Sequence, residues 1–321
     1  MTDQLDLTKV PMSDIRAELH TRSKSVAKTT ATLDAAPASP LASAPTGKLV
    51  GELLNQEKVI YGVDDRKDFF EFKTNAKVSQ LANSVAALFF DSDVTDNGDG
   101  TSTLRTQPFG QSRGLCSGER FFNQPIGAFC SGFLVGPDLI ATAGHCANAG
   151  NVTTILFVFG FRMEDANTPV TRIPNKDIYR GKAMLGREEQ GAGADWGLIQ
   201  LGRPVTDRAV LQVRRTGRIA DTASVSVIGH PTGLPVKFAD GANVRDNTPT
   251  AFFVANLDTY GGNSGSPVFG ANHVVEGILV RGEADFVSNG TCNVSKVCPS
   301  TGCRGEDCTR IAELIDLIPV A

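Results

Sequence analysis

Short runs of β-branched and aromatic residues constrain the fold of this chain more than any other feature. They recur from about residue 59 onward and have the length and composition of strands. The clearest runs are 152–161, 224–229 and 251–257. Residues 133–143 hold two apolar runs around a Gly-Pro-Asp turn, which predicts a hairpin. The sequence therefore predicts an all-β domain of the sandwich or barrel type.

The acidic segment 91–100 has two interpretations. Its aspartates invite a calcium site, but no frame fits the EF-hand pattern and no glutamate closes the loop. A hairpin turn at Asn97-Gly98 is the interpretation that we favour.

Composition excludes several classes of protein. The chain has 321 residues, 41% of them hydrophobic and 21% charged, as in a soluble globular protein. Its 31 basic and 35 acidic residues give a net charge of −4, which offers no basic surface for nucleic acid. No apolar run approaches the roughly 20 residues that span a bilayer. We expect protein or peptide partners, neither nucleic acid nor membrane, and a monomer.

Residues 27–46 mark a division of the chain. Sixteen of these 20 residues are Ala, Ser, Thr or Pro, a composition that buries too little apolar surface to offset its ordering entropy. Residues 1–58 are therefore predicted to be a largely disordered leader, and residues 59–321 a folded domain. The first 20 residues show no basic start followed by an apolar core, so no signal peptide is visible.

Seven cysteines indicate the compartment. Four of them lie within 292–308 at spacings of six, five and five, without a CxxC pair, which suits structural zinc poorly. Disulfides are the favoured interpretation, and they imply a secreted or periplasmic protein. Because seven is odd, at least one thiol stays free or pairs outside the chain. We expect no metal and no cofactor.

Three segments carry candidate chemistry. ATAGHC (141–146) places His145 directly after a predicted strand, GADWGLIQL (193–201) places Asp195 at the start of an apolar strand, and TYGGNSGSPVF (259–269) surrounds Ser264 with glycines. A buried aspartate is costly unless a group such as a histidine NH accepts its charge. Glycines let the backbone turn sharply, so that the NH groups of Gly262 and Ser264 can converge as an oxyanion hole.

Together these segments resemble the chymotrypsin- and trypsin-like serine endopeptidases, which carry His, Asp and Ser in this order. The resemblance spans about residues 59–318. VIYGVDDR near its start, GHPTGLPVKFADGA (229–242) and GNSGSP look most like the bacterial glutamyl-endopeptidase-like branch. It implies two antiparallel six-stranded β-barrels, a closing helix and an active site between the barrels. The residues themselves predict that helix over 310–318, with Thr309 as its cap and Ile311, Leu314, Ile315 and Ile318 on one face. Carried over by motif, His145 is the general base, Asp195 its orienting partner and Ser264 the nucleophile.

The chemistry of these side chains agrees with those roles. A serine hydroxyl attacks only when a base takes its proton, and a free histidine has a pKa of about 6.5, suited to that exchange. An aspartate on the other ring nitrogen fixes the tautomer. Cys130 and Cys146, on the strand before His145 and directly beside it, are expected to form a disulfide that holds the base in register. At least one further bridge should brace 283–308.

The sequence departs from the family pattern at two places. Asn263 stands where the trypsin group has the aspartate that pairs with a newly released N-terminus. The stretch 277–283 lacks the histidine with which the glutamyl branch holds an acidic side chain. These departures weaken two expectations: that the enzyme is activated by such an ion pair, and that it is specific for glutamate. We still expect a zymogen, cut near Lys58, in which the leader aids folding or blocks the cleft.

The predicted substrate specificity rests on the spacing between one aspartate and Ser264. Asp258 lies six residues before Ser264, as does the aspartate at the base of the specificity pocket in the trypsin group. We expect it to attract Arg or Lys before the scissile bond, with Gly282 leaving the pocket wall open. Arg281 is the neighbouring pocket residue, and it could instead neutralise Asp258.

Other assignments of the pocket stay open. Glu306 or Asp307 could be the operative acid, Asp258 could be an ordinary surface turn residue, and Thr259 would line the pocket of a glutamyl-specific enzyme. Two further functions also stay open: a catalytically silent binding module on the same scaffold, and an esterase.

Overall fold

The fold consists of two closed β-barrels, as expected. The computed structural model describes residues 59–191, 193–282 and 285–320. The predicted leader 1–58, with its linker at 27–46, lies outside the described residues. The first barrel closes in the order β10-β12-β13-β9-β8-β3. Its strands are β3 (Val85–Phe90), β8 (Cys130–Gly136), β9 (Leu139–Thr142), β10 (Ile155–Phe159), β12 (Ile178–Glu189) and β13 (Asp195–Leu201).

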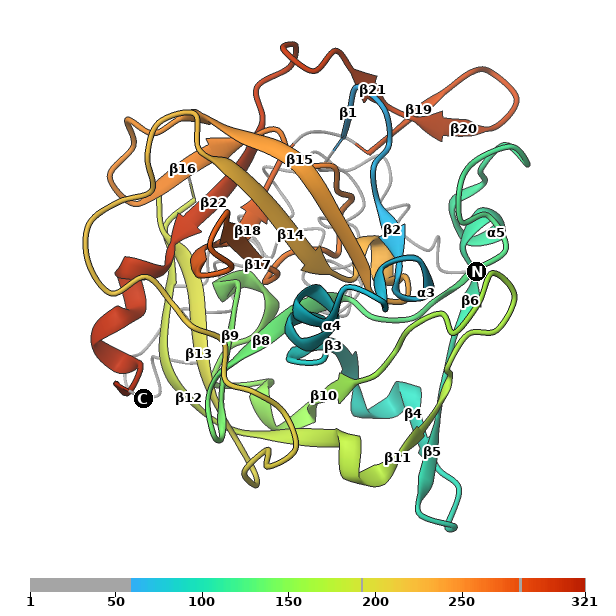
Figure 1. The fold of residues 1–321 in the computed structure, drawn as a ribbon. Helices are drawn as coiled ribbons and strands as arrows, with labels where there is room; N and C mark the ends of the chain where they lie inside the picture. Colours follow the sequence, from blue (N-terminus) through green and yellow to red (C-terminus); the bar gives the residue numbers. More distant parts are fainter. Residues whose placement is uncertain (1–58, 192, 283–284, 321) are drawn as a thin grey trace, which may run out of the picture.

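The second barrel follows the first in sequence and packs against it (Figure 1). Its strands run in the order β14-β17-β18-β22-β16-β15, and a pairing of β14 with β15 closes the ring. The short strand β2 (Lys67–Asp68) adds to the outer side of β15. The six closing strands are β14 (Ser224–Gly229), β15 (Lys237–Asp246), β16 (Phe252–Ala255), β17 (Pro267–Gly270), β18 (Val275–Arg281) and β22 (Glu306–Arg310).

The predicted strands and turns are confirmed. Strands β8 and β9 form the hairpin expected over 133–143. The runs at 152–161, 224–229 and 251–257 contain β10, β14 and β16. Strands β4 (Val94–Asp96) and β5 (Thr101–Leu104) form the second hairpin, in whose turn Gly98 has a φ of +74°. A left-handed backbone of this kind favours glycine.

One apolar cluster joins the two barrels. It includes Phe133 and Leu198 of the first barrel together with Phe269 and Ile278 of the second, all fully buried. A separate cluster around Phe253 fills the second barrel. The barrels therefore share a core, which holds their facing strands in register with one another.

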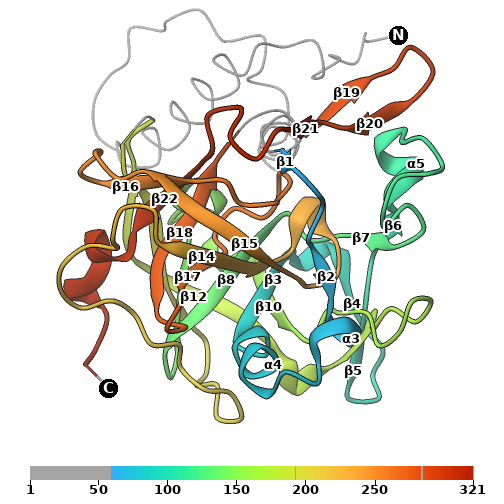
Figure 2. The same ribbon diagram turned by 45° about the horizontal axis from the view of Figure 1, so that its top comes forward.

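Smaller elements decorate this core. Figure 2 shows β1 beside β21, with which it pairs in parallel, and the β19–β20 hairpin beyond them. The remaining strands are β1 (Ile60–Tyr61), β6 (Gln107–Pro108), β7 (Pro125–Ile126), β11 (Arg172–Pro174), β19 (Phe286–Ser288), β20 (Asn293–Ser295) and β21 (Val297–Cys298). The helices are α3 (Phe69–Phe72), α4 (Ala76–Ala82) and α5 (Phe109–Arg113), with 3₁₀ turns η2 (Asp91–Asp93), η3 (Gly144–Cys146), η4 (Val152–Thr154), η5 (Asn175–Asp177) and η6 (Pro231–Gly233).

The C-terminal helix differs from its prediction. The structure has a 3₁₀ helix, η7 (Ile311–Leu317), whose N-cap residue is Arg310 and has no side-chain cap. Thr309 does not cap it, because this residue belongs to β22. The apolar face is as expected, since Ile311 and Leu314 are buried.

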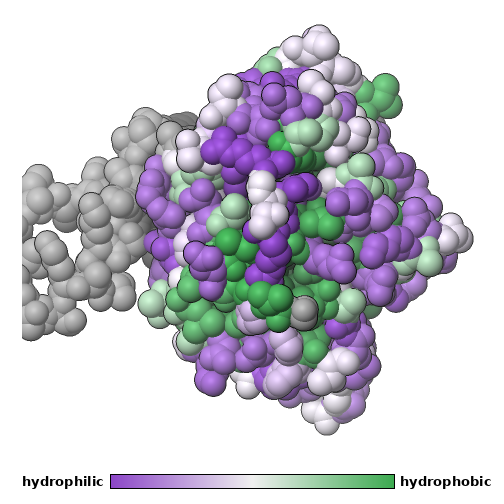
Figure 3. Space-filling view, turned by 60° about the vertical axis from the view of Figure 1, so that its left-hand side comes forward, coloured by the Kyte–Doolittle hydropathy of each residue, from purple (hydrophilic) through white to green (hydrophobic). Residues whose placement is uncertain are grey.

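Helix η7 lies on the left of Figure 1, and Figure 3 brings that side forward. There apolar residues gather in the lower half among hydrophilic ones. In the part of the chain that the structure describes, no helix is long and apolar enough to cross a membrane.

Three disulfides form among the described residues. Cys130 bonds to Cys146, the expected pair. Cys298 bonds to Cys303 within the distal cluster, and Cys116 bonds to Cys292 across 176 residues. Both of the latter brace the 283–308 region, as expected. The odd count is resolved by Cys308, which takes part in none of the three.

A buried ion pair fixes the start of the domain to the second barrel. The ammonium group of Lys237 donates to Asp68, to Gln124 Oε1 at 2.8 Å and to the carbonyl of Pro235 at 3.0 Å. Both charged side chains are almost fully buried. Burial lowers the pKa of Lys237 to about 8, against the opposing effect of Asp68. Removing one partner leaves the other as an uncompensated buried charge.

We expect Lys237→Met to lower the free energy of unfolding by about 3–5 kcal/mol, because Asp68 is then buried without its cation. Lys67→Met is the matched control, since Lys67 lies next to Asp68 on β2 and its pair with Asp240 is exposed. That control should cost at most about 1 kcal/mol. Urea unfolding of both variants measures the difference, and equal losses would contradict a role for the buried pair.

Candidate active site

His145 lies on η3, directly after β9, and its neighbour Gly144 determines how closely it approaches β13. A Cβ at Gly144 would overlap the carbonyl oxygen of Glu188 and lie 3.1 Å from Asp195 Oδ1. Because glycine avoids this overlap, the backbone NH of His145 reaches Asp195 Oδ1 at 3.1 Å. Arg187 Nε holds the same turn by donating to the carbonyls of Gly144 and Ala147.

The His145 and Asp195 side chains form a short hydrogen bond. His145 Nδ1 lies 2.7 Å from Asp195 Oδ2. Burial alone would raise the pKa of the Asp195 carboxyl, but His145 and, less strongly, Arg281 hold it below its usual range. A carboxylate accepting at Nδ1 fixes the proton there, which leaves Nε2 as the basic nitrogen.

Two elements of the second barrel contact Asp195. Its backbone NH donates to Thr309 Oγ1 at 3.1 Å, from β22. The guanidinium of Arg281, at the end of β18, lies with Nη1 3.9 Å from Asp195 Oδ2. The aspartate of the first barrel is thus held in part by the second.

Ser264 is buried in the loop before β17, close to the strands that lead to His145. Its carbonyl oxygen accepts from the NH of Ser131 at 2.8 Å and lies 3.7 Å from Cys146 Sγ. Its hydroxyl donates to the carbonyl of Val280 at 3.3 Å. Gly265 permits this approach, because a Cβ there would overlap Ser131 O and Thr142 Oγ1. Sequence positions 131, 146 and 264 therefore meet at one place.

The turn before Ser264 contains a glycine in the left-handed region. Gly262 has a φ of +78°, which a larger residue rarely adopts. Its NH enters no hydrogen bond among the residues that the structure describes. The role of the Gly262 and Ser264 amides remains a prediction.

Asn263 is part of a neutral network. Its Nδ2 donates to Thr259 Oγ1 at 2.6 Å, and its Oδ1 accepts from Ser266 Oγ at 2.8 Å. Thr259 is fully buried, and its hydroxyl takes part in this network. The network stiffens the loop that carries Ser264 without an ion pair.

Asp258 does not lie as a free acid at a pocket floor. Its Oδ1 accepts from the NH of Tyr61 at 2.7 Å and its Oδ2 from the NH of Asp65 at 3.0 Å. Burial raises its pKa. The pKa of Asp65 is raised to about 7, first by burial and then by the negative charge of Asp258. Both oxygens thus bind the start of the domain, so the geometry does not favour the expected substrate contact.

The other two expected pocket residues, Gly282 and Arg281, have different surroundings. Gly282 lies against the carboxylate of Glu306, which a Cβ at position 282 would overlap. Arg281 points elsewhere. Its Nε donates to Asp307 Oδ2 at 3.2 Å and its Nη2 to the carbonyl of Gly193 at 2.7 Å, so it does not neutralise Asp258.

Sequence reasoning missed three contributors to this site. Thr309 was assigned to a helix cap, Arg281 to the substrate pocket, and Arg187 was not singled out. No local motif marks them, because each contacts the site through a distant part of the chain.

The chain is similar to known peptidases in sequence and in fold. Residues 130–278 match the family model of the trypsin-like peptidase domain. A curated relative, the "Extracellular metalloprotease" of Bacillus subtilis (strain 168), is 30% identical over 149 residues, which are 44% of this chain. The chain spans about 45% of that relative's length. A solved glutamyl endopeptidase in complex with MPD matches 81% of this chain and 98% of its own, with 19% identity and a TM-score of 0.46.

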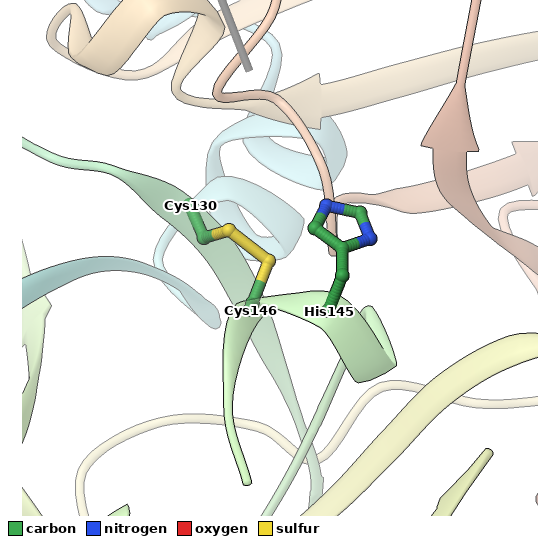
Figure 4. A group of neighbouring side chains, drawn as sticks. All are labelled: Cys130, His145 and Cys146. Carbon is green, nitrogen blue, oxygen red and sulfur yellow. A yellow bond between two sulfur atoms is a disulfide. The ribbon is translucent and has the colours of Figure 1, made fainter. Parts of the chain in front are cut away.

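The name of the Bacillus relative raises the question of a metal. Among the described residues, the one group of three side chains close enough to hold an ion is Cys130, His145 and Cys146. Figure 4 shows the His145 ring next to the disulfide that joins the two sulfurs. Neither sulfur is a thiolate, the form that binds metal. His145 Nδ1 is also engaged with Asp195. These residues do not fit a metal site.

Proposed function

We propose that this chain, a peptidase of the chymotrypsin- and trypsin-like family, is a serine endopeptidase that cleaves peptide bonds through an acyl-enzyme. In the proposed mechanism His145 is the general base, Asp195 orients it, and Ser264 is the nucleophile. The amides of Gly262 and Ser264 stabilise the oxyanion.

The observation that carries the proposal is the bond of 2.7 Å between His145 Nδ1 and Asp195 Oδ2. A proton fixed on Nδ1 leaves Nε2 able to take the serine proton and return it to the leaving amine. The buried carboxylate stabilises the imidazolium that forms in between. The contacts of the Ser264 loop with Ser131 and Cys146 support a nucleophile close to this base.

Two other functions make different demands. A binding module on the same scaffold has no use for a buried His–Asp pair whose carboxylate costs free energy to desolvate. An esterase would use the same three residues but would leave casein intact. Labelling by a fluorophosphonate and hydrolysis of casein separate the three functions.

Ser264→Ala should abolish peptide hydrolysis and fluorophosphonate labelling while the fold is kept. Loss of a triad nucleophile lowers kcat on the order of 10⁶-fold. Ser226→Ala, on β14, is the control and should keep both activities. Casein cleavage and intact-mass analysis of the labelled protein measure the effect. Near-normal hydrolysis by Ser264→Ala would refute the assignment.

We keep a preference for Arg or Lys before the scissile bond as part of the proposal, with a different acid as its source. Glu306 is fully buried, and its carboxylate lies against Gly282, the expected pocket wall. Because it lies beside the expected pocket wall, Glu306 is the acid that we propose attracts a basic side chain.

Glu306→Gln should lower cleavage after Arg by about 100-fold or more, because the basic side chain is then buried without its partner. Asp258→Asn is the matched variant and should retain the Arg rate. Two substrates that differ only in Arg or Glu before the bond provide the assay. A wild-type preference for Glu would contradict basic specificity, and loss of the Arg rate in Asp258→Asn alone would return the role to Asp258.

Residues 1–58 are proposed to be a leader that is removed in maturation. The carbonyl of Val59 lies 3.5 Å from the NH of Thr259, and Val59 itself is buried, so the domain holds its chain from residue 59. Lys58, the residue before it, lies outside the described residues and suits a protease with basic specificity. N-terminal sequencing of active enzyme should give Val59 or a neighbour, whereas residue 1 would contradict this.

The compartment is proposed to be oxidising and outside the cytoplasm. Three disulfides within one domain favour a secreted or periplasmic protein.

A further inference from the structure

We propose that Arg281 is a positioning residue that sets the base strength of His145 by sharing the charge of Asp195, an inference that rests on the proposed triad. One carboxylate oxygen faces both the His145 ring and the Arg281 guanidinium. Asp195 Oδ2 lies 2.7 Å from His145 Nδ1 and 3.9 Å from Arg281 Nη1. In the described residues these are the two ion-pair partners of Asp195.

Arg281 is held in this position from two further sides. Its Nε donates to Asp307 at 3.2 Å, and its Nη2 donates to the carbonyl of Gly193, two residues before Asp195. Its side chain is 11% exposed. A guanidinium with three fixed contacts and little access to water cannot swing away, and it stays charged at every pH at which a protein is folded.

The other charged groups near the pair are engaged with one another. Asp307 also binds Arg304 at 2.6 Å. On the side of η3, Arg187 donates to backbone carbonyls and pairs with Glu189. Glu188, from β12, accepts from the indole NH of Trp196. Arg281 is therefore the charge that acts on Asp195 most directly, apart from His145 itself.

The direction of the effect follows from electrostatics. Asp195 favours the protonated form of His145, and a cation close to the same oxygen weakens that preference. His145 then loses its proton, and becomes able to act as a base, at lower pH. Without Arg281 the carboxylate acts on His145 alone, and the negative charge of Asp307 adds to it. The acid limb of the pH–activity profile then moves to higher pH.

The first test measures kcat/KM against pH. Arg281→Met should move the midpoint of the acid limb upward by about 1 pH unit or more, because the cation near the Asp195 carboxylate is lost. Arg281→Lys keeps a cation and should move it less. Arg214→Met is the matched control, because Arg214 pairs with Glu276 at the opposite end of β18. Its midpoint should stay at the wild-type value.

A second measurement does not depend on turnover. The ring protons of His145 are followed by NMR in a Ser264→Ala background, with His145→Gln providing the assignment. Adding Arg281→Met should raise the titration midpoint by the same amount. If the wild type hydrolyses nothing, the proposed function fails, while this titration still tests the coupling between Arg281 and His145.

A double variant controls for misfolding of Arg281→Met. Arg281→Met combined with Asp307→Asn removes both charges of that pair, so Asp307 is not left as a carboxylate without Arg281, and it should still raise the midpoint. An unchanged midpoint in folded Arg281→Met and in the double variant, with only plateau activity or stability lost, would overturn the proposal and leave Arg281 as a brace for the backbone at Gly193.

Discussion

The rest of this structure depends on the burial of one carboxylate. Asp195 is 3% exposed, and a charge in such a place is stable only if its surroundings offset its lost hydration. The offset comes from the ring and backbone NH of His145 and from Arg281, while Thr309 accepts the NH of Asp195. These partners belong to η3, β18 and β22, so the charge is accommodated only when both barrels are in place.

Close approach of backbone segments makes this possible. Gly144 lets η3 lie against β12 and β13, and Gly265 lets the Ser264 loop lie against β8 and β9. At each place one methyl group would overlap a carbonyl oxygen. The site is therefore built by contact of main chains, and its precision comes from the shared core that holds the two barrels together.

Much of this was predictable from local sequence and the rest was not, for a physical reason. Strands such as β10 and β14 follow from their β-branched composition, and the Cys130–Cys146 bond from its place beside His145. The partners of Asp258 are 193 and 197 residues away. The spacing from Ser264 gives the position of Asp258 in its loop, but it does not tell which distant residues lie next to Asp258. The contacts of Arg281 with Asp195 and Gly193 could not be predicted for the same reason, since those residues lie more than 80 positions earlier in the sequence.

The hydrogen bonds that Asp258 accepts from Tyr61 and Asp65 have a consequence for the kinetics of folding. Tyr61 leaves the ribosome 197 residues before Asp258, which accepts its backbone NH. Contacts of this span must overcome a large loop-closure entropy, and folds rich in them form slowly. Asp258 and the loop that carries Ser264 can therefore join the start of the domain only after the strands of the first barrel, which lie between them in sequence, have been made.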